Sequence, residues 1–157
     1  MSKVLKALII ILNSITLQRG LYCLAFLAFG IGDGLTSAYM MDARGPYIEA
    51  NPVIRDLFLT AGFNGMVLFK LWVTFMMLLA IHIRQGQSRE NLYWTVNGVL
   101  FAIIMGGFMG VYFNMNVING AIPPEPNLII IIYAALVLVF IEIGGFIDNC
   151  VSSKTES

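Results

Sequence analysis

The segment NLIIIIYAALVLVFIEIGGFI, residues 127–147, carries a single charged side chain, Glu142. A transmembrane helix needs about 20 consecutive, predominantly apolar residues, so this segment is long enough to cross the hydrocarbon core of a bilayer. Three further segments qualify, at residues 21–41, 64–83 and 92–113, the last with room for one more turn. Because these runs do not alternate as barrel strands do, the sequence predicts an all-α fold, an integral membrane bundle of four transmembrane helices.

The composition of the whole chain also indicates that lipid is the surrounding solvent. Hydrophobic residues make up 59% of its 157 positions and charged residues 11%, whereas soluble domains carry roughly 25% charged residues. We therefore expect one membrane domain, residues 1–157, in contact with membrane lipids. Nine basic residues balance nine acidic ones, and without a basic excess we expect no nucleic-acid partner.

The basic residues also predict the orientation, because Lys and Arg favour cytoplasmic connections. Two of them, Arg44 and Arg55, lie on one side of the predicted spans. The side that holds both termini carries Lys3, Lys6, Arg19, Arg84, Arg89 and Lys154. We predict a protein of the cell membrane with both termini in the cytoplasm.

The connections and termini carry their own signals. Residues 1–19 include a short apolar stretch that we interpret as an interfacial helix on the cytoplasmic side; a bent continuation of the first span is the alternative. Asn51 and Pro52 form a helix start, and Gly62 suits an exit, so a short helix over residues 52–61 is expected in the first outer connection. Residues 152–157 are expected to form a mobile tail.

Three charged side chains fall within the predicted spans: Asp33, Lys70 and Glu142. Each costs roughly 2.5–3.5 kcal/mol to insert, so each is expected to face the bundle interior and find a partner. The rise of a helix per residue places Asp33 and Lys70 at similar depth in the outer half, which predicts an ion pair. Asn97 and Glu142 share a depth in the inner half and would form a hydrogen bond if the Glu142 carboxyl is protonated.

Small residues accompany these polar positions at helical spacing. Gly30 and Gly34 on the first span form a small-x-x-x-small pair that permits close helix contact, and Gly106 and Gly110 do so on the third. We interpret these four glycines as helix-packing residues.

The stretch from Asp33 to Lys70 contains a spaced set of polar residues and turn formers. It resembles the signature of an uncharacterised family of small prokaryotic multi-pass membrane proteins, a domain of unknown function, in which an Asp is followed by Thr-Thr, Gly, Glu-x-Asn-Pro and a Lys. The corresponding residues are Asp33, Thr36, Ser37, Gly45, Glu49, Asn51, Pro52 and Lys70. Ser37 replaces the second Thr and keeps its hydroxyl. The resemblance covers about a quarter of the chain and implies a multi-span helical fold, but no activity.

The same residues define a predicted polar cluster, either structural or ligand-binding: Asp33, Thr36, Ser37, Glu49, Asn51 and Lys70. Asp33, Glu49 and Asn51 could supply oxygen ligands for Mg²⁺, Mn²⁺ or Ca²⁺ if the outer connection folded inward. A single histidine with no neighbouring cysteine argues against zinc, haem or iron–sulfur sites. We assign no metal ligand, no cofactor and no catalytic residue.

Three functions fit this sequence. We favour a non-catalytic subunit or interaction partner, in a homo-oligomer or a larger membrane-protein complex, because the connections are short. An oligomeric channel or a proton- or ion-coupled transporter of a small solute is the first alternative. An intramembrane enzyme that uses Asp33 and Glu49 is the second. A closed, directly paired cluster would favour a structural role, and a cavity around Asp33, Glu49 and Lys70 would favour transport or catalysis.

Overall fold

The computed structural model describes residues 16–88 and 91–155 of the chain. Most of the predicted interfacial segment, residues 1–15, lies outside these ranges, as do residues 156 and 157 of the predicted tail. Within the described residues the first helix begins at Leu17, where the Thr16 side chain accepts a hydrogen bond from the Arg19 backbone N–H and so caps the helix. Residues 17–44 form one continuous helix. No break therefore separates residues 17–19 of the predicted interfacial segment from the first span.

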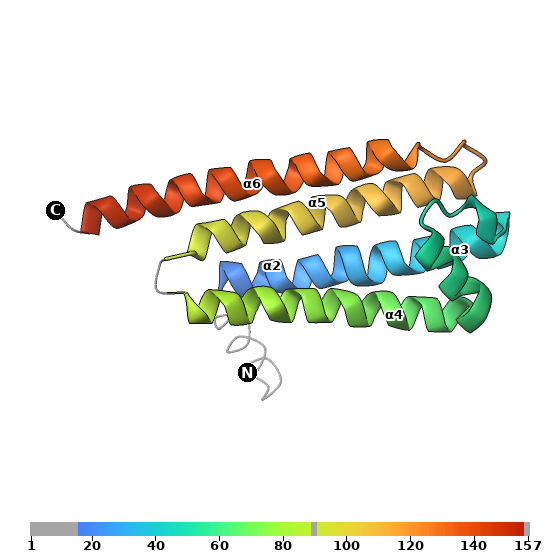
Figure 1. Ribbon diagram of the computed structural model, residues 1–157, viewed down its shortest axis with the longest axis horizontal. Helices are drawn as coiled ribbons and strands as arrows, with labels where there is room; N and C mark the ends of the chain where they lie inside the picture. Colours follow the sequence, from blue (N-terminus) through green and yellow to red (C-terminus); the bar gives the residue numbers. More distant parts are fainter. Residues whose placement is uncertain (1–15, 89–90, 156–157) are drawn as a thin grey trace, which may run out of the picture.

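Four helical rods run antiparallel to their neighbours in the chain (Figure 1). The first is continuous and comprises α2 (Leu17–Ala25), the π-helical segment η1 (Phe26–Gly32) and α3 (Asp33–Arg44). The short 3₁₀ turn η2 (Pro46–Ile48) leads into α4 (Pro52–Gln87), which is followed by α5 (Tyr93–Ile118) and α6 (Pro126–Thr155). All four rods are long and apolar enough to cross a membrane, which confirms the predicted all-α bundle of four transmembrane helices.

We name the two ends of the bundle by what lies there. The η2 end holds η2 and the connection between α5 and α6, and the terminal end holds the start of α2 and the end of α6 (Figure 1). In this arrangement α3 packs against both α4 and α5, and α5 packs against α6 along its length.

Local sequence explains where the helices begin and end. Gly45 follows α3 with a φ of 89°, a left-handed conformation that favours glycine and stops the helix. The Asn51 side chain then accepts from the Val53 N–H and caps α4, with Pro52 in its first position. Gly62 has a φ of 68° inside α4 and divides it into the short arm predicted over residues 52–61 and the span that follows. At the far end α6 continues to Thr155, so residues 152–155 of the predicted tail are helical.

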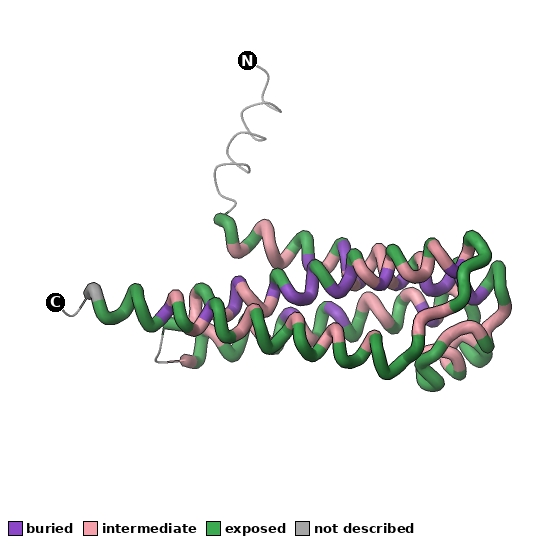
Figure 2. The backbone as a smooth tube through the Cα atoms, turned by 90° about the horizontal axis from the view of Figure 1, so that it is seen from above, coloured by how far each residue is buried: buried purple, intermediate pink, exposed green. Residues whose placement is uncertain are grey.

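Burial is unequal among the four rods. In an apolar stretch of 18 residues taken from each helix, 50% of the α5 stretch is buried but only 6% of the α6 stretch. Buried residues run along the inside of the bundle, and many residues on its outside are exposed (Figure 2). Large apolar side chains such as Leu68, Trp72 and Ile131 are more than half exposed, as expected of a protein whose outer surface meets hydrocarbon.

The interior contains two apolar clusters along the bundle. One comprises Ala25, Leu78, Val96, Leu100, Ile103 and Ile104. The other lies nearer the η2 end and comprises Ala38, Met40, Met41, Met66 and Val117. The charged residues discussed next belong to neither cluster.

Candidate functional site

Asp33 and Lys70 form an ion pair between the first two rods. The Lys70 Nζ lies 2.7 Å from Asp33 Oδ2, and the two side chains are only 17% and 14% exposed. This is the contact that helix depth predicted. In a low-dielectric surrounding, a nearby opposite charge lowers the free-energy cost of burying a charged side chain. Asp33 and Lys70 therefore each make the burial of the other less costly.

The backbone before Asp33 is unusual. The segment η1 winds more widely than an α-helix, and the Asp33 N–H donates to the Ala28 carbonyl, five residues back. Such π-helical turns are rare and are often found at functional sites. Here the wide turns set the rotation of α3, and therefore the side of the rod on which Asp33 lies.

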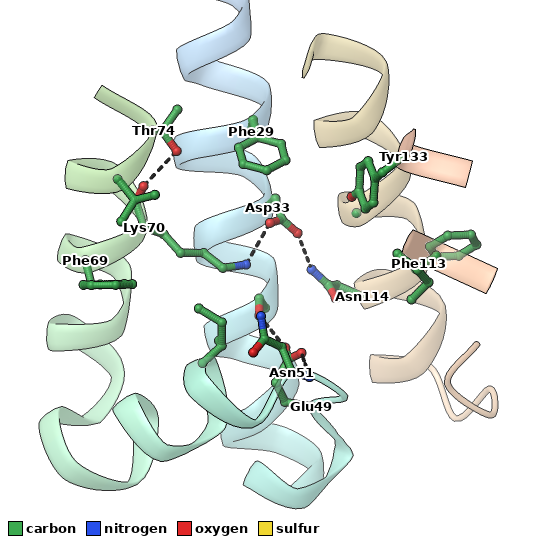
Figure 3. Close-up of a pocket in the computed structure, with 15 residues that line it drawn as sticks. Phe29, Asp33, Glu49, Asn51, Phe69, Lys70, Thr74, Phe113, Asn114 and Tyr133 are labelled. Atoms are coloured by element: carbon green, nitrogen blue, oxygen red, sulfur yellow. Dashed lines mark hydrogen bonds and ion pairs between the residues drawn. The ribbon is translucent and has the colours of Figure 1, made fainter. Parts of the chain in front are cut away.

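Asn114 holds the other side of the Asp33 carboxylate. Its Nδ2 donates to Asp33 Oδ1 and to Thr36 Oγ1, both at 3.1 Å. The Thr36 hydroxyl in turn donates to the Gly32 carbonyl at 2.8 Å. Asp33 is thus fixed from α4 by a charged donor and from α5 by a neutral one (Figure 3).

Glu49 and Asn51 fasten the η2 connection to this region. The Ser37 hydroxyl donates to Glu49 Oε2 at 3.1 Å, which ties the connection to α3. The other oxygen, Glu49 Oε1, accepts from the Asn51 N–H at 2.9 Å. All six residues of the predicted polar cluster lie in the half of the bundle nearer the η2 end, where two hydrogen-bonded groups form around Asp33 and around Glu49.

Each of the four predicted packing glycines faces a particular residue of a neighbouring helix. A Cβ atom on Gly30 would lie 3.3 Å from Thr74 Cγ2, and one on Gly34 would lie 3.6 Å from Lys70 Cβ, so both face α4. A Cβ on Gly106 would meet the Tyr133 ring on α6. Gly110 differs, since its Cβ would lie 2.5 Å from Asp33 Oδ1. Gly110 thus makes room for the carboxylate itself.

A cavity of about 340 Å³ lies beside the ion pair, between α3, α4, α5 and the start of α6. Small-molecule pockets generally combine apolar and aromatic walls with a few polar groups, and this cavity has that character (Figure 3). Its polar lining consists of Asp33, Ser37, Glu49, Asn51, Lys70, Thr74 and Asn114, and its aromatic lining consists of Phe29, Phe69, Phe113 and Tyr133. The polar cluster is therefore both directly paired and exposed to a cavity.

Asn114 and Tyr133 are site residues that the sequence analysis missed. The predicted third span covers residues 92–113 with room for one more turn, and Asn114 is not among its predicted site residues; α5 continues to Ile118. Its spacing from Gly106 and Gly110 was an available signal, because positions four apart share one face of a helix. Tyr133 donates to the Gly106 carbonyl at 2.9 Å and joins α6 to the cavity wall.

The predicted hydrogen bond between Asn97 and Glu142 is wrong. Asn97 is buried, with 6% of its surface exposed, whereas Glu142 is exposed on α6. Neither polar atom of the Asn97 side chain has a hydrogen-bond partner among the residues that the structure describes. The α6 face that packs against α5 carries Gly144 and Asp148, and Glu142 lies two residues before Gly144, on nearly the opposite side of a helix with 3.6 residues per turn.

Asp148 has a structural role that was also missed. Its Oδ1 accepts from the Trp94 N–H at 2.9 Å, and its Oδ2 accepts from the Thr95 N–H and hydroxyl, both at 2.8 Å. The side chain, which is 4% exposed, therefore caps the first turn of α5 from the neighbouring helix. This contact satisfies N–H groups that the helix itself leaves without partners.

The described residues do not bring three or more His, Cys, Asp or Glu side chains together in a group that would hold a metal ion. The site is instead an ion pair and a carboxylate that share one cavity inside a multi-pass membrane protein.

Comparison with known families gives the chain its place. The model of a domain of unknown function, DUF5658, matches residues 24–120, and the chain belongs to this family. The stretch from Asp33 to Lys70 lies within the matched residues, and the expected membership of an uncharacterised family is confirmed. No curated protein and no solved structure matches the chain.

Proposed function

We propose that this protein binds a small polar solute in the cavity beside Asp33 and Lys70, as the recognition site of a channel or a proton- or ion-coupled transporter that works as an oligomer. One observation carries the proposal: the Lys70 ammonium is paired and still faces a cavity. An ammonium has three N–H donors. Within residues 16–88 and 91–155, Asp33 is the one acceptor of the Lys70 ammonium. Two donors are therefore available to a solute in the cavity of about 340 Å³.

The carboxylates add acceptors to these donors. Each Glu49 oxygen accepts one hydrogen bond, from Ser37 or from Asn51, and a carboxylate oxygen has room for a second. The charges of Asp33, Glu49 and Lys70 do not cancel, so the cavity wall carries a net negative charge. A solute that presents an acceptor oxygen to Lys70 and a cationic or N–H group to Glu49 fits this arrangement.

The ion pair supplies a means of coupling. A solute oxygen that draws the Lys70 ammonium away leaves Asp33 with Asn114 as its remaining donor. A partly buried carboxylate without its counter-charge is costly, so a cation that replaces the Lys70 ammonium beside Asp33 would be favoured there. Solute binding and cation binding would then assist one another in this site.

Reconstituted protein provides the test. Purified full-length chain in liposomes should conduct protons under an imposed potassium diffusion potential when glycine, which carries both an acceptor oxygen and a cationic group, is present outside; a trapped pH-sensitive dye reads the flux. Asp33→Asn and Lys70→Met should abolish that flux, and Glu142→Gln, on an exposed face of α6, should leave it unchanged. If both cavity variants conduct like the wild type, or if glycine does not raise the thermal unfolding temperature of the wild type, the proposal fails.

A role as a non-catalytic subunit is the second candidate, and the exposure of α6 supports it. Only 6% of its 18-residue apolar stretch is buried, which leaves a long apolar surface for helices of other chains or for lipid. Native purification in mild detergent, followed by mass spectrometry, tests this role. A chain that always migrates alone would count against it and would leave the solute-binding proposal standing.

The orientation is also proposed. The basic residues at the terminal end, Arg19 and Arg84 among them, support a cytoplasmic location for that end. The cavity at the η2 end would then be reached from outside the cell.

A further inference from the structure

The cavity beside Asp33 and Lys70 is bordered by two helices that do not pack along each other. Its lining includes Phe69 and Val73 of α4 and Tyr133 of α6. Within residues 16–88 and 91–155, α4 packs on η1 and α3, and α6 packs on α5, but no comparable contact joins α4 to α6. Phe69 and Tyr133 accordingly lie on opposite sides of the ion pair (Figure 3).

Two residues of the cavity wall also belong to the outer surface of the bundle. Phe69 is 36% exposed and Val73 is 39% exposed, and both line the cavity. They share α4 with Leu68 and Trp72, whose exposed side chains meet hydrocarbon in a membrane-spanning bundle. The cavity is therefore continuous with the lipid-facing surface between α4 and α6, and we call this region the side opening.

The η2 connection covers the cavity at the η2 end. Glu49 and Asn51 of the connection line the cavity, as does Ile54 in the first turn of α4. The hydrogen bond from the Ser37 hydroxyl to Glu49 holds this cover against α3. The cover stands between the ion pair and the water at that end of the bundle, whereas the side opening leads to lipid.

Beyond the ion pair, the cavity wall continues toward the middle of the bundle. Phe29 lies four residues before Asp33 on the first rod, and Val73 lies three residues after Lys70 on α4, so both are closer to the middle. A polar head group held between Lys70 and Glu49 would therefore direct an attached hydrocarbon chain toward the midplane of the membrane. Amphiphiles in a bilayer leaflet have this same orientation.

The size of the cavity limits what lies inside it. Its volume of about 340 Å³ is near the lower end of the range for small-molecule pockets, roughly 300–1,000 Å³. This space suits a head group but not a long chain in addition. A ligand with a hydrocarbon chain fits if the chain leaves through the side opening into lipid.

We propose that the ligand of this cavity is a single-chain amphiphile with a zwitterionic head group, which enters from the bilayer through the side opening. Its anionic oxygen binds the Lys70 ammonium, its ammonium binds the Glu49 carboxylate, and its chain remains in lipid between α4 and α6. This inference rests on the ligand binding proposed for the cavity, not on transport. Lysophosphatidylethanolamine, whose head group carries a phosphate and an ammonium, belongs to this class.

Photolabelling of the full chain in phosphatidylglycerol nanodiscs tests the proposal. One probe is lysophosphatidylethanolamine with a diazirine in its acyl chain, and the other is lysophosphatidylglycerol with the same chain, which keeps the phosphate but lacks the ammonium. The ethanolamine probe should label peptides from α4 and α6, and unlabelled lysophosphatidylethanolamine should compete. We expect the glycerol probe to label roughly tenfold less, equivalent to about 1.4 kcal/mol.

Three variants test the route and the head-group contact. Val73→Trp places a bulky ring at the side opening and should reduce labelling by the ethanolamine probe roughly tenfold. Leu68→Trp, at a position that is 65% exposed and outside the cavity lining, is the matched control and should label like the wild type. Glu49→Gln removes the partner of the ammonium, so the two probes should then label equally.

Three results would overturn the proposal: equal labelling of the wild type by both probes, unchanged labelling of Val73→Trp, or equal competition by water-soluble phosphoethanolamine at the same concentration. The last result would place the entrance in water and would leave solute binding in the cavity standing. Labelling as expected without the glycine-dependent proton flux would instead remove transport and keep the amphiphile. Should Val73→Trp fail to fold, the ratio of the two probes in the wild type and in Glu49→Gln still decides.

Discussion

The Asp33 carboxylate lies against Gly110, so closely that a Cβ atom on Gly110 would be 2.5 Å from Asp33 Oδ1. The carboxylate therefore occupies the space that any other residue at position 110 would need for its side chain. Gly110 and Asp33 belong to different rods, and this contact sets how near α3 and α5 approach beside the cavity.

The first prediction concerns Gly110→Ala. The added methyl group must displace the Asp33 carboxylate, which Lys70 and Asn114 hold in place. Overpacking of this kind typically costs about 1–3 kcal/mol, so thermal unfolding in detergent should shift to lower temperature. Gly86→Ala is the matched control, because nothing lies within 4 Å of a Cβ atom there. If both variants unfold at the same temperature, the described contact is not present in solution.

The second prediction is a double-mutant cycle on the ion pair. Asp33→Asn or Lys70→Met alone leaves one partly buried charge without its partner, which costs up to about 3–5 kcal/mol. The double variant removes both charges and should recover most of that loss, so the effects should be strongly non-additive. Chemical unfolding of all four proteins measures the coupling. Additive losses would show that the two side chains do not interact energetically.

The third prediction concerns the cap that Asp148 provides. Asp148→Ala removes the acceptors of the Trp94 and Thr95 N–H groups. Loss of a helix cap costs about 0.5–2 kcal/mol, and the effect should be concentrated in the first turn of α5. Hydrogen–deuterium exchange should show faster exchange at these two amides, with Asn149→Ala, at an exposed neighbouring position, as the control. Unchanged exchange at both amides would remove Asp148 from this role.

The fourth prediction tests the orientation. Cys150 is exposed near the terminal end of α6, and Ile122 is 90% exposed in the connection between α5 and α6 at the η2 end. A membrane-impermeant maleimide on intact cells should label Ile122→Cys, made in a Cys23→Ser, Cys150→Ser background. The native Cys150 should become reactive only after permeabilisation. The reverse pattern would place the termini outside.

The sequence determined the fold better than the site because the two depend on different quantities. Length and apolarity were enough to find four spans, and Asn51, Pro52 and Gly62 marked the start of α4 and its bend. Depth along a helix is also readable from sequence, and it correctly paired Asp33 with Lys70.

The side of a helix on which a residue lies is harder to read from sequence than its depth along the helix. The wrong prediction for Asn97 and Glu142 follows from this. Depth alone placed Asn97 beside Glu142, although the two side chains do not face each other. The contact of Gly144 and Asp148 with the start of α5 shows which side of α6 faces inward. The cavity depends in addition on the spacing between rods, and no single-sequence pattern reports that spacing.

The wide turns of η1, from Phe26 to Gly32, rotate the side chains of α3 about the helix axis relative to those of α2. Successive residues of an α-helix are rotated by about 100°, so a chain one residue shorter at this point would turn every later side chain of that rod by about the same angle. Asp33, Thr36 and Ser37 would then leave their partners together, while α2 would keep its own. The segment therefore allows the two halves of one continuous helix, toward the terminal end and toward the η2 end, to present their side chains to different neighbouring helices.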